Sequence, residues 1–143
     1  MKKIISEKFV KQAIIKWLYR HSWARNLQAG ELRDKGIDIR VRHNEYSRYF
    51  LIETKGEGSQ NSKSRKSQCE THFIYGLGRI VTRMNAGRAR YYYGLGLPVS
   101  NARIAIRRLP WQAAKKLLLY IFSVDHTGRV MQYSWQDLKR AQE

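Results

Sequence analysis

Two β-type patterns, separated by a short polar segment, constrain the fold of this chain more than any other feature. Residues 36–42 alternate, with Ile37, Ile39 and Val41 at every second position, and residues 49–55 form a second run rich in β-forming side chains. Alternation with a period of two places the apolar residues on one face of a strand. The two segments therefore predict a β-hairpin.

The hairpin register brings two acids together. A turn about the middle of residues 43–48 places Asp38 directly opposite Glu53, in the register that also pairs Arg40 with Leu51. Opposed like charges destabilise a strand pair, and a divalent ion between the carboxylates would relieve the repulsion. Lys55 shares a strand face with Glu53 and would stand beside that ion as a fixed positive charge.

This arrangement, an Asp on one strand, a loop, and then Glu-x-Lys after an apolar run, resembles the PD-(D/E)xK phosphodiesterase superfamily. That superfamily has the restriction-endonuclease-like fold and includes Mrr-type restriction enzymes and archaeal Holliday-junction resolvases. The likeness covers residues 6–97, although Ile37 stands where the superfamily name has proline. It implies an α+β fold of α/β/α layers, in which helices flank a central mixed β-sheet.

The resemblance also implies roles for individual residues. Asp38, Glu53 and the carbonyl of Thr54 would hold Mg²⁺ or Mn²⁺, and Lys55 would position the attacking water. Glu7 matches an acid on the first helix of several branches, and on a helical wheel it aligns with Ile14 and Leu18 at the edge of the apolar stripe, which would turn it inward. An acid at this position can instead serve only to stabilise the helix through its dipole. The implied activity is a magnesium-dependent endonuclease that hydrolyses DNA phosphodiester bonds through a metal-activated water.

Charge independently points to a polyanionic partner. The chain has 28 Lys and Arg against 11 Asp and Glu, a formal charge of +17, which favours DNA, with RNA as an open alternative. No acid lies between Glu70 and Asp125, so the adjacent Arg107 and Arg108 are expected to have no local acid to neutralise them. The predicted nucleic-acid contacts are Lys63, Arg65, Lys66, Arg79, Arg83, Arg107 and Arg108.

Further elements follow from periodicity and turn residues. A helix is expected from its N-cap Ser6 to about Arg20, and a mobile polar loop over 56–67. A second helix carries apolar residues from Phe73 to Met84, with Gly76 and Gly78 expected against the sheet. We expect a strand at 90–97, short helices at 100–109 and 110–116, a hairpin of 117–124 with 129–133, and a capped helix from Ser134.

Length and composition bound the remaining possibilities. The 143 residues, 43% of them hydrophobic, suit a single domain spanning 1–143. No stretch approaches the roughly 20 apolar residues of a spanning helix, and a lone Cys69 suits a reducing compartment. We therefore expect a cytoplasmic protein without membrane contact, and a homodimer stays open.

Two alternatives to the enzyme remain at this stage. Asp38 and Glu53 can be part of a solvated sheet face on which Arg40, Arg42 or Lys55 neutralises them. The whole chain can also be a non-catalytic nucleic-acid-binding module with the same fold. Retention of two acids and a lysine together favours the enzyme, because binding a polyanion needs no acids.

Overall fold

The computed structural model describes residues 4–23, 38–57, 62–84 and 90–143, and for residues 62–67 it describes the backbone alone. Within these ranges, five strands form one mixed sheet flanked by five helices, which confirms the α+β class. The sheet order is β1 (Ile39–Arg42), β2 (Arg48–Thr54), β3 (Arg90–Pro98), β4 (Leu119–Val124) and β5 (Val130–Tyr133). The central strands β2, β3 and β4 are parallel, and each edge strand pairs antiparallel with its neighbour.

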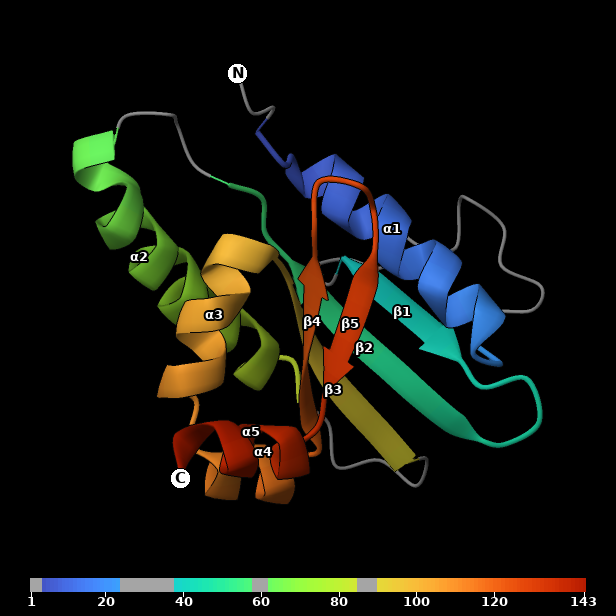
Figure 1. The fold of residues 1–143 in the computed structure, drawn as a ribbon. Helices are drawn as coiled ribbons and strands as arrows, with labels where there is room; N and C mark the ends of the chain where they lie inside the picture. The colour runs from blue at the N-terminus through green and yellow to red at the C-terminus, as the bar shows by residue number, and fades with distance from the viewer. Residues whose placement is uncertain (1–3, 24–37, 58–61, 85–89) are drawn as a thin grey trace.

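The helices form layers on the two faces of the sheet (Figure 1). Helix α1 (Glu7–Arg20) covers one face, and α2 (Ser62–Val81) and α3 (Val99–Arg108) cover the other. The short helices α4 (Trp111–Leu117) and α5 (Trp135–Gln142) pack on each other at one end of the sheet. Two apolar cores result, one under α1 and one under the remaining helices.

The β1–β2 hairpin has the predicted register. Arg40 pairs with Leu51 and Arg42 with Tyr49, and the burial of β1 alternates, with Ile39 buried and Arg40 exposed. The two faces of β2 feed different cores, because Phe50 and Ile52 belong to the core under α1 while Leu51 belongs to the other. By the same alternation, Glu53 and Lys55 lie on the α2 side of the sheet.

Helix α1 begins and packs as its sequence predicts. The Ser6 hydroxyl accepts a hydrogen bond from the Phe9 N–H at 3.1 Å, which confirms the N-cap. Val10, Ile14 and Leu18 are buried against the sheet. A Cβ at Gly96 of β3 would collide with Ile14, so glycine at that position lets the helix lie directly on the strand.

The predicted loop over 56–67 is wrong in its second half, because α2 already begins at Ser62. The segment has no apolar residue, but the Lys and Arg residues within 62–67 have good helix propensity. Figure 1 shows the first turns of α2 extending past the sheet, where a helix needs no apolar face. The helical backbone of residues 62–67 therefore reflects continuation of the packed helix that follows.

The two glycines of α2 behave differently. A Cβ at Gly76 would lie 3.4 Å from Leu95 of β3, so this part of the helix does approach the sheet as predicted. Gly78 has open space around it and is exposed, so the prediction that it also packs on the sheet is wrong. The difference follows from helical geometry, since residues two apart point in different directions.

The C-terminal third follows the sequence closely. Helices α3 and α4, the β4–β5 hairpin and α5 all appear within two residues of their expected bounds. Ser134 caps α5 in a capping box with Asp137. None of the helices in the described part of the chain is long and apolar enough to cross a membrane.

Candidate metal centre

Asp38 and Glu53 meet where the β1–β2 hairpin opens at the carboxyl end of β2. Asp38 immediately precedes β1, and its Oδ2 accepts a hydrogen bond from the Thr54 N–H at 2.8 Å. That bond fixes one carboxylate against the backbone next to Glu53. The structure thus brings together the two acids that the register predicts to be opposite.

Glu53 is the more deeply placed acid of the pair. Only 1% of it is exposed, and its Oε2 is buried without a hydrogen-bond partner. Burial is the main cause that raises the pKa of the Glu53 carboxyl, the adjacent Asp38 raises it further, and the value reaches about 7 against an ordinary 4.5. Such a buried, incompletely satisfied carboxylate is costly for folding and is typical of a functional site.

Two cations face this carboxylate. The Nε of Arg79, on α2, lies 3.1 Å from Glu53 Oε1, without the alignment of a hydrogen bond. Lys55 follows two residues after Glu53, and its charge, like that of Arg79, opposes the rise in the Glu53 pKa. Both cations also approach the ring of Tyr75, with Lys55 Nζ 4.8 Å and Arg79 Cζ 6.0 Å from its centroid.

The donor set fits a hard divalent ion that keeps part of its water shell. In the described ranges, no three side chains of His, Cys, Asp or Glu gather into a metal site. Mg²⁺ commonly binds through one or two carboxylates and retains several waters, so a pair of acids is sufficient. The buried, unpartnered Glu53 Oε2 beside Asp38 is an oxygen that such an ion would satisfy.

The predicted third acid, Glu7, is exposed, so the expectation that it faces inward is wrong. It occupies the first turn of α1, where side chains tilt toward the helix N-terminus and, here, into solvent. Its backbone nevertheless lies close to the site, because a Cβ at Gly56 would collide with the Glu7 N–H. Whether Glu7 takes part in the chemistry stays a prediction.

Glu57 holds the segment that precedes α1 close to the end of β2. Its Oε1 accepts a hydrogen bond from the Ile5 N–H at 2.8 Å, and its Oε2 accepts one from the Ser100 hydroxyl at 3.1 Å. The Glu57 N–H in turn donates to the Ile5 carbonyl at 2.8 Å. This acid therefore connects the start of α1, the end of β2 and the start of α3, and acts as a structural anchor.

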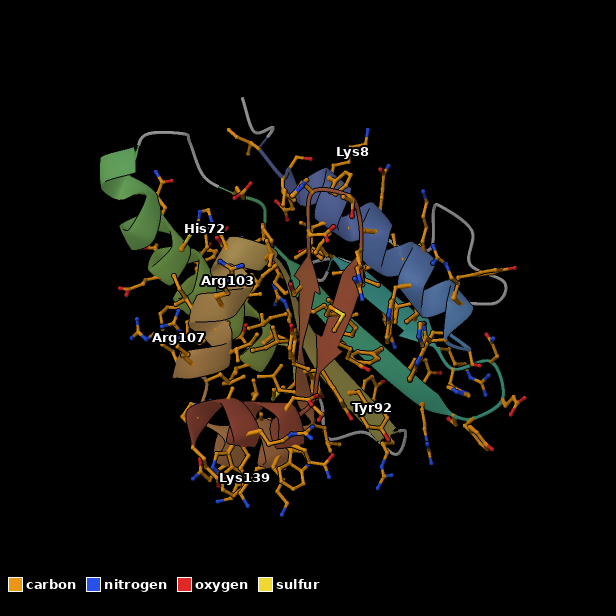
Figure 2. All side chains as sticks on the ribbon, viewed as in Figure 1. Lys8, His72, Tyr92, Arg103, Arg107 and Lys139 are labelled. Carbon is orange, nitrogen blue, oxygen red and sulfur yellow. The ribbon has the colours of Figure 1, made fainter. Side chains whose placement is uncertain are left out.

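The predicted nucleic-acid contacts have different surroundings. Arg83 and Arg107 are exposed, and Figure 2 shows Arg103 and Arg107 projecting from α3. Arg108 pairs with Glu70 of α2 at 3.5 Å, so the expectation that it lacks a local acid is wrong. The cause is the packing of α2 on α3, which brings together residues far apart in sequence. The side chains of Lys63, Arg65 and Lys66 lie outside the described residues.

Sequence reasoning missed two features of the site. It assigned Arg79 to a phosphate-binding surface without its contact to Glu53, and it did not consider Tyr75. A signal was present, since residues four apart on a helix share a face and Tyr75 precedes Arg79 by four. What the sequence lacked was the angle at which α2 crosses β2, which decides what that face contacts.

Comparison with known proteins adds little to this geometry. Neither a family model nor a curated protein matches the chain. Among solved structures, an XisH family protein from Nostoc punctiforme PCC 73102 is similar over 88% of this chain and 98% of that one, at 16% identity and a TM-score of 0.46. The function therefore has to be argued from the residues of the site.

Proposed function

We propose that the protein is a metal-dependent nuclease that hydrolyses DNA phosphodiester bonds at the Asp38–Glu53 pair. The observation that carries the proposal is the buried Glu53 carboxylate, whose Oε2 has no hydrogen-bond partner beside a second acid. A protein of charge +17 gains nothing for DNA binding from a buried Glu53 next to a half-buried Asp38, because these acids repel phosphates. The resemblance of the Asp, Glu-x-Lys pattern to PD-(D/E)xK enzymes supports the same assignment.

In this proposal Asp38, Glu53 and the Thr54 carbonyl hold Mg²⁺ or Mn²⁺. The ion, when bound, would supply Lewis acidity toward the phosphate and make a coordinated water more acidic. Lys55 places a positive charge on the same strand face as Glu53, where it would orient the scissile phosphate or the attacking water. The Thr54 N–H holds the Asp38 carboxylate in a fixed orientation through its 2.8 Å hydrogen bond.

Arg79 supplies the positive charge that Glu53 needs before metal arrives. An isolated buried carboxylate is unfavourable, and the guanidinium 3.1 Å away offsets part of that cost. The Arg79 side chain is 37% exposed, so it would also be within reach of a phosphate at the site.

A second candidate function is nucleic-acid binding without catalysis. The Arg79–Glu53 contact favours it, because an acid that already has a guanidinium partner does not require a metal. The two functions differ in one measurable respect, since only the enzyme cuts DNA when Mg²⁺ is added.

Nicking of supercoiled plasmid in Mg²⁺ separates the two. Asp38→Asn and Glu53→Gln should lower the cleavage rate by about 100-fold or more, because each removes a metal ligand worth several kcal/mol in the transition state. Glu45→Gln is the matched control, since Glu45 is an exposed acid at the turn of the same hairpin and its loss changes the charge equally.

Lys55→Gln in the same assay should also lose cleavage while calorimetry still detects metal binding. Wild-type protein that binds DNA but never nicks it in Mg²⁺ or Mn²⁺ would leave the binding module as the function. Equal rates for wild type and Asp38→Asn would mean that any cleavage arises elsewhere.

A further inference from the structure

Tyr75 presents a large aromatic side chain to solvent next to the acid pair. It lies on α2 and is 58% exposed, and its neighbour Ile74 is exposed as well. The helix is held close to the sheet here, because Gly76 packs against Leu95 of β3. Tyr75 therefore stands on an anchored backbone at the edge of the site.

The two cations of the site both approach this ring. Lys55 Nζ lies over the ring at 4.8 Å from the centroid, and Arg79 Cζ lies 6.0 Å from it. The same two residues carry charges close to Glu53, Lys55 from just beyond the end of β2 and Arg79 by direct ion pairing. An aromatic face, two cationic side chains and the acid pair thus occupy neighbouring positions.

We infer that Tyr75, Lys55 and Arg79 form a subsite for an unpaired nucleotide. Single-stranded nucleic acid is bound by aromatic side chains that stack on bases and by cations that follow the backbone. The base would stack on the exposed part of the Tyr75 ring, and its phosphate would lie between Lys55 and Arg79. This inference rests on the proposed function, and it adds that the preferred substrate has an unpaired base beside the cleavage site.

The unpaired state is required by geometry. In a continuous duplex the faces of each base are covered by its neighbours, so a side chain reaches a base face only where the strand is single or the base is extruded. A duplex would offer this surface only phosphates. Tyr75 should therefore discriminate single strands from duplexes, whereas Lys55 and Arg79 should bind both.

The competing explanation is an ordinary surface cation–π contact, which is worth about 0.5 to 1 kcal/mol and implies no ligand. The chain offers an internal control for it. Tyr46 is 53% exposed and has Arg48 Cζ at 5.1 Å from its ring centroid. It lies in the β1–β2 turn, at the end of β2 opposite to Glu53.

The test is fluorescence anisotropy of a labelled oligonucleotide, as a single strand and as its duplex, in Ca²⁺ buffer. Tyr75→Ala should weaken binding of the single strand by about tenfold, because one stacked base is lost, and binding of the duplex by less than about twofold. Tyr75→Phe keeps the ring and should bind both like wild type. Tyr46→Ala should also bind both like wild type.

Several outcomes would overturn the subsite. The subsite is contradicted if Tyr75→Ala loses affinity equally for single strand and duplex, or loses none. It is also contradicted if Tyr46→Ala loses as much affinity as Tyr75→Ala. Heparin, a polyanion without bases, should bind Tyr75→Ala and wild type alike, and a large difference would point to an acidic partner of another kind. These measurements need no cleavage, so failure of the nuclease proposal appears in the Asp38→Asn nicking assay instead.

Discussion

The carboxyl groups of the C-terminal hairpin and helix have lowered pKa values, whereas the pKa of Glu53, at the end of β2, is raised. Asp125 accepts hydrogen bonds from the Thr127 hydroxyl, the Thr127 N–H and the Arg129 N–H at 2.6 to 2.9 Å, and the first of these is the main cause that lowers its pKa. The Ser134 N–H does the same for the pKa of Asp137. Glu53 instead has a raised pKa and a buried oxygen without a partner.

The difference separates acids that stabilise the fold from acids that are available for chemistry. Asp125 and Asp137 receive their hydrogen bonds from residues within four positions in sequence, so each closes a local turn or cap. Glu53 is surrounded by Asp38, Lys55 and Arg79. The charges of the two cations only partly compensate its burial and the repulsion by Asp38. A carboxylate that costs free energy of folding needs another reason to be there, and we assign that reason to metal binding.

We expect the largest difference between Glu53 and the C-terminal acids in the pH dependence of the free energy of unfolding, measured by urea denaturation in EDTA. The pKa of Glu53 is about 7 in the folded state and about 4.5 when unfolded. Because the folded state holds this proton more tightly than the unfolded state, stability that is fully present below pH 4.5 is lost as the pH rises through about 7. Glu53→Gln should remove that loss and be more stable than wild type at pH 8, by on the order of 3 kcal/mol.

Asp137→Asn should show the reverse pattern. A lowered folded-state pKa means that the stabilisation is present above the unfolded value of 3.8 and is lost as the pH falls through the folded value. At pH 8 the variant should lose about 1 kcal/mol, the usual worth of a capping interaction, and its difference from wild type should shrink as the pH is lowered below 3.8. If Glu53→Gln and Asp137→Asn both gained or both lost stability at pH 8, the proposed difference between these two acids would be wrong.

The sequence could predict what is local or periodic. The hairpin register follows from alternation, and the caps at Ser6 and Ser134 follow from residue type at a helix start. Contacts between α2 and its neighbours could not be predicted, because they depend on how two rigid elements cross. The Arg79–Glu53 and Arg108–Glu70 pairs both belong to this second class.

A smaller effect tests the basic surface through the adjacent arginines of α3. Arg108 pairs with Glu70, whereas Arg107 pairs with no carboxylate in the described part of the chain. If both touched DNA equally, removing either would flatten the plot of log K against log salt by about one unit. We expect that change for Arg107→Gln and a smaller one for Arg108→Gln, in binding titrations with duplex DNA and Ca²⁺. Equal slopes for wild type and Arg107→Gln would exclude Arg107 from the interface.

The central claim, that the unsatisfied Glu53 and its partner Asp38 hold a divalent ion, is tested most directly by anomalous diffraction from crystals grown with Mn²⁺. We predict one strong peak within roughly 2.0 to 2.6 Å of oxygens of both Asp38 and Glu53, with Arg79 displaced from its 3.1 Å contact. The peak should be absent in Glu53→Gln crystals. Saturating Mn²⁺ that leaves no peak between the acids, with Arg79 still paired to Glu53, would contradict the account.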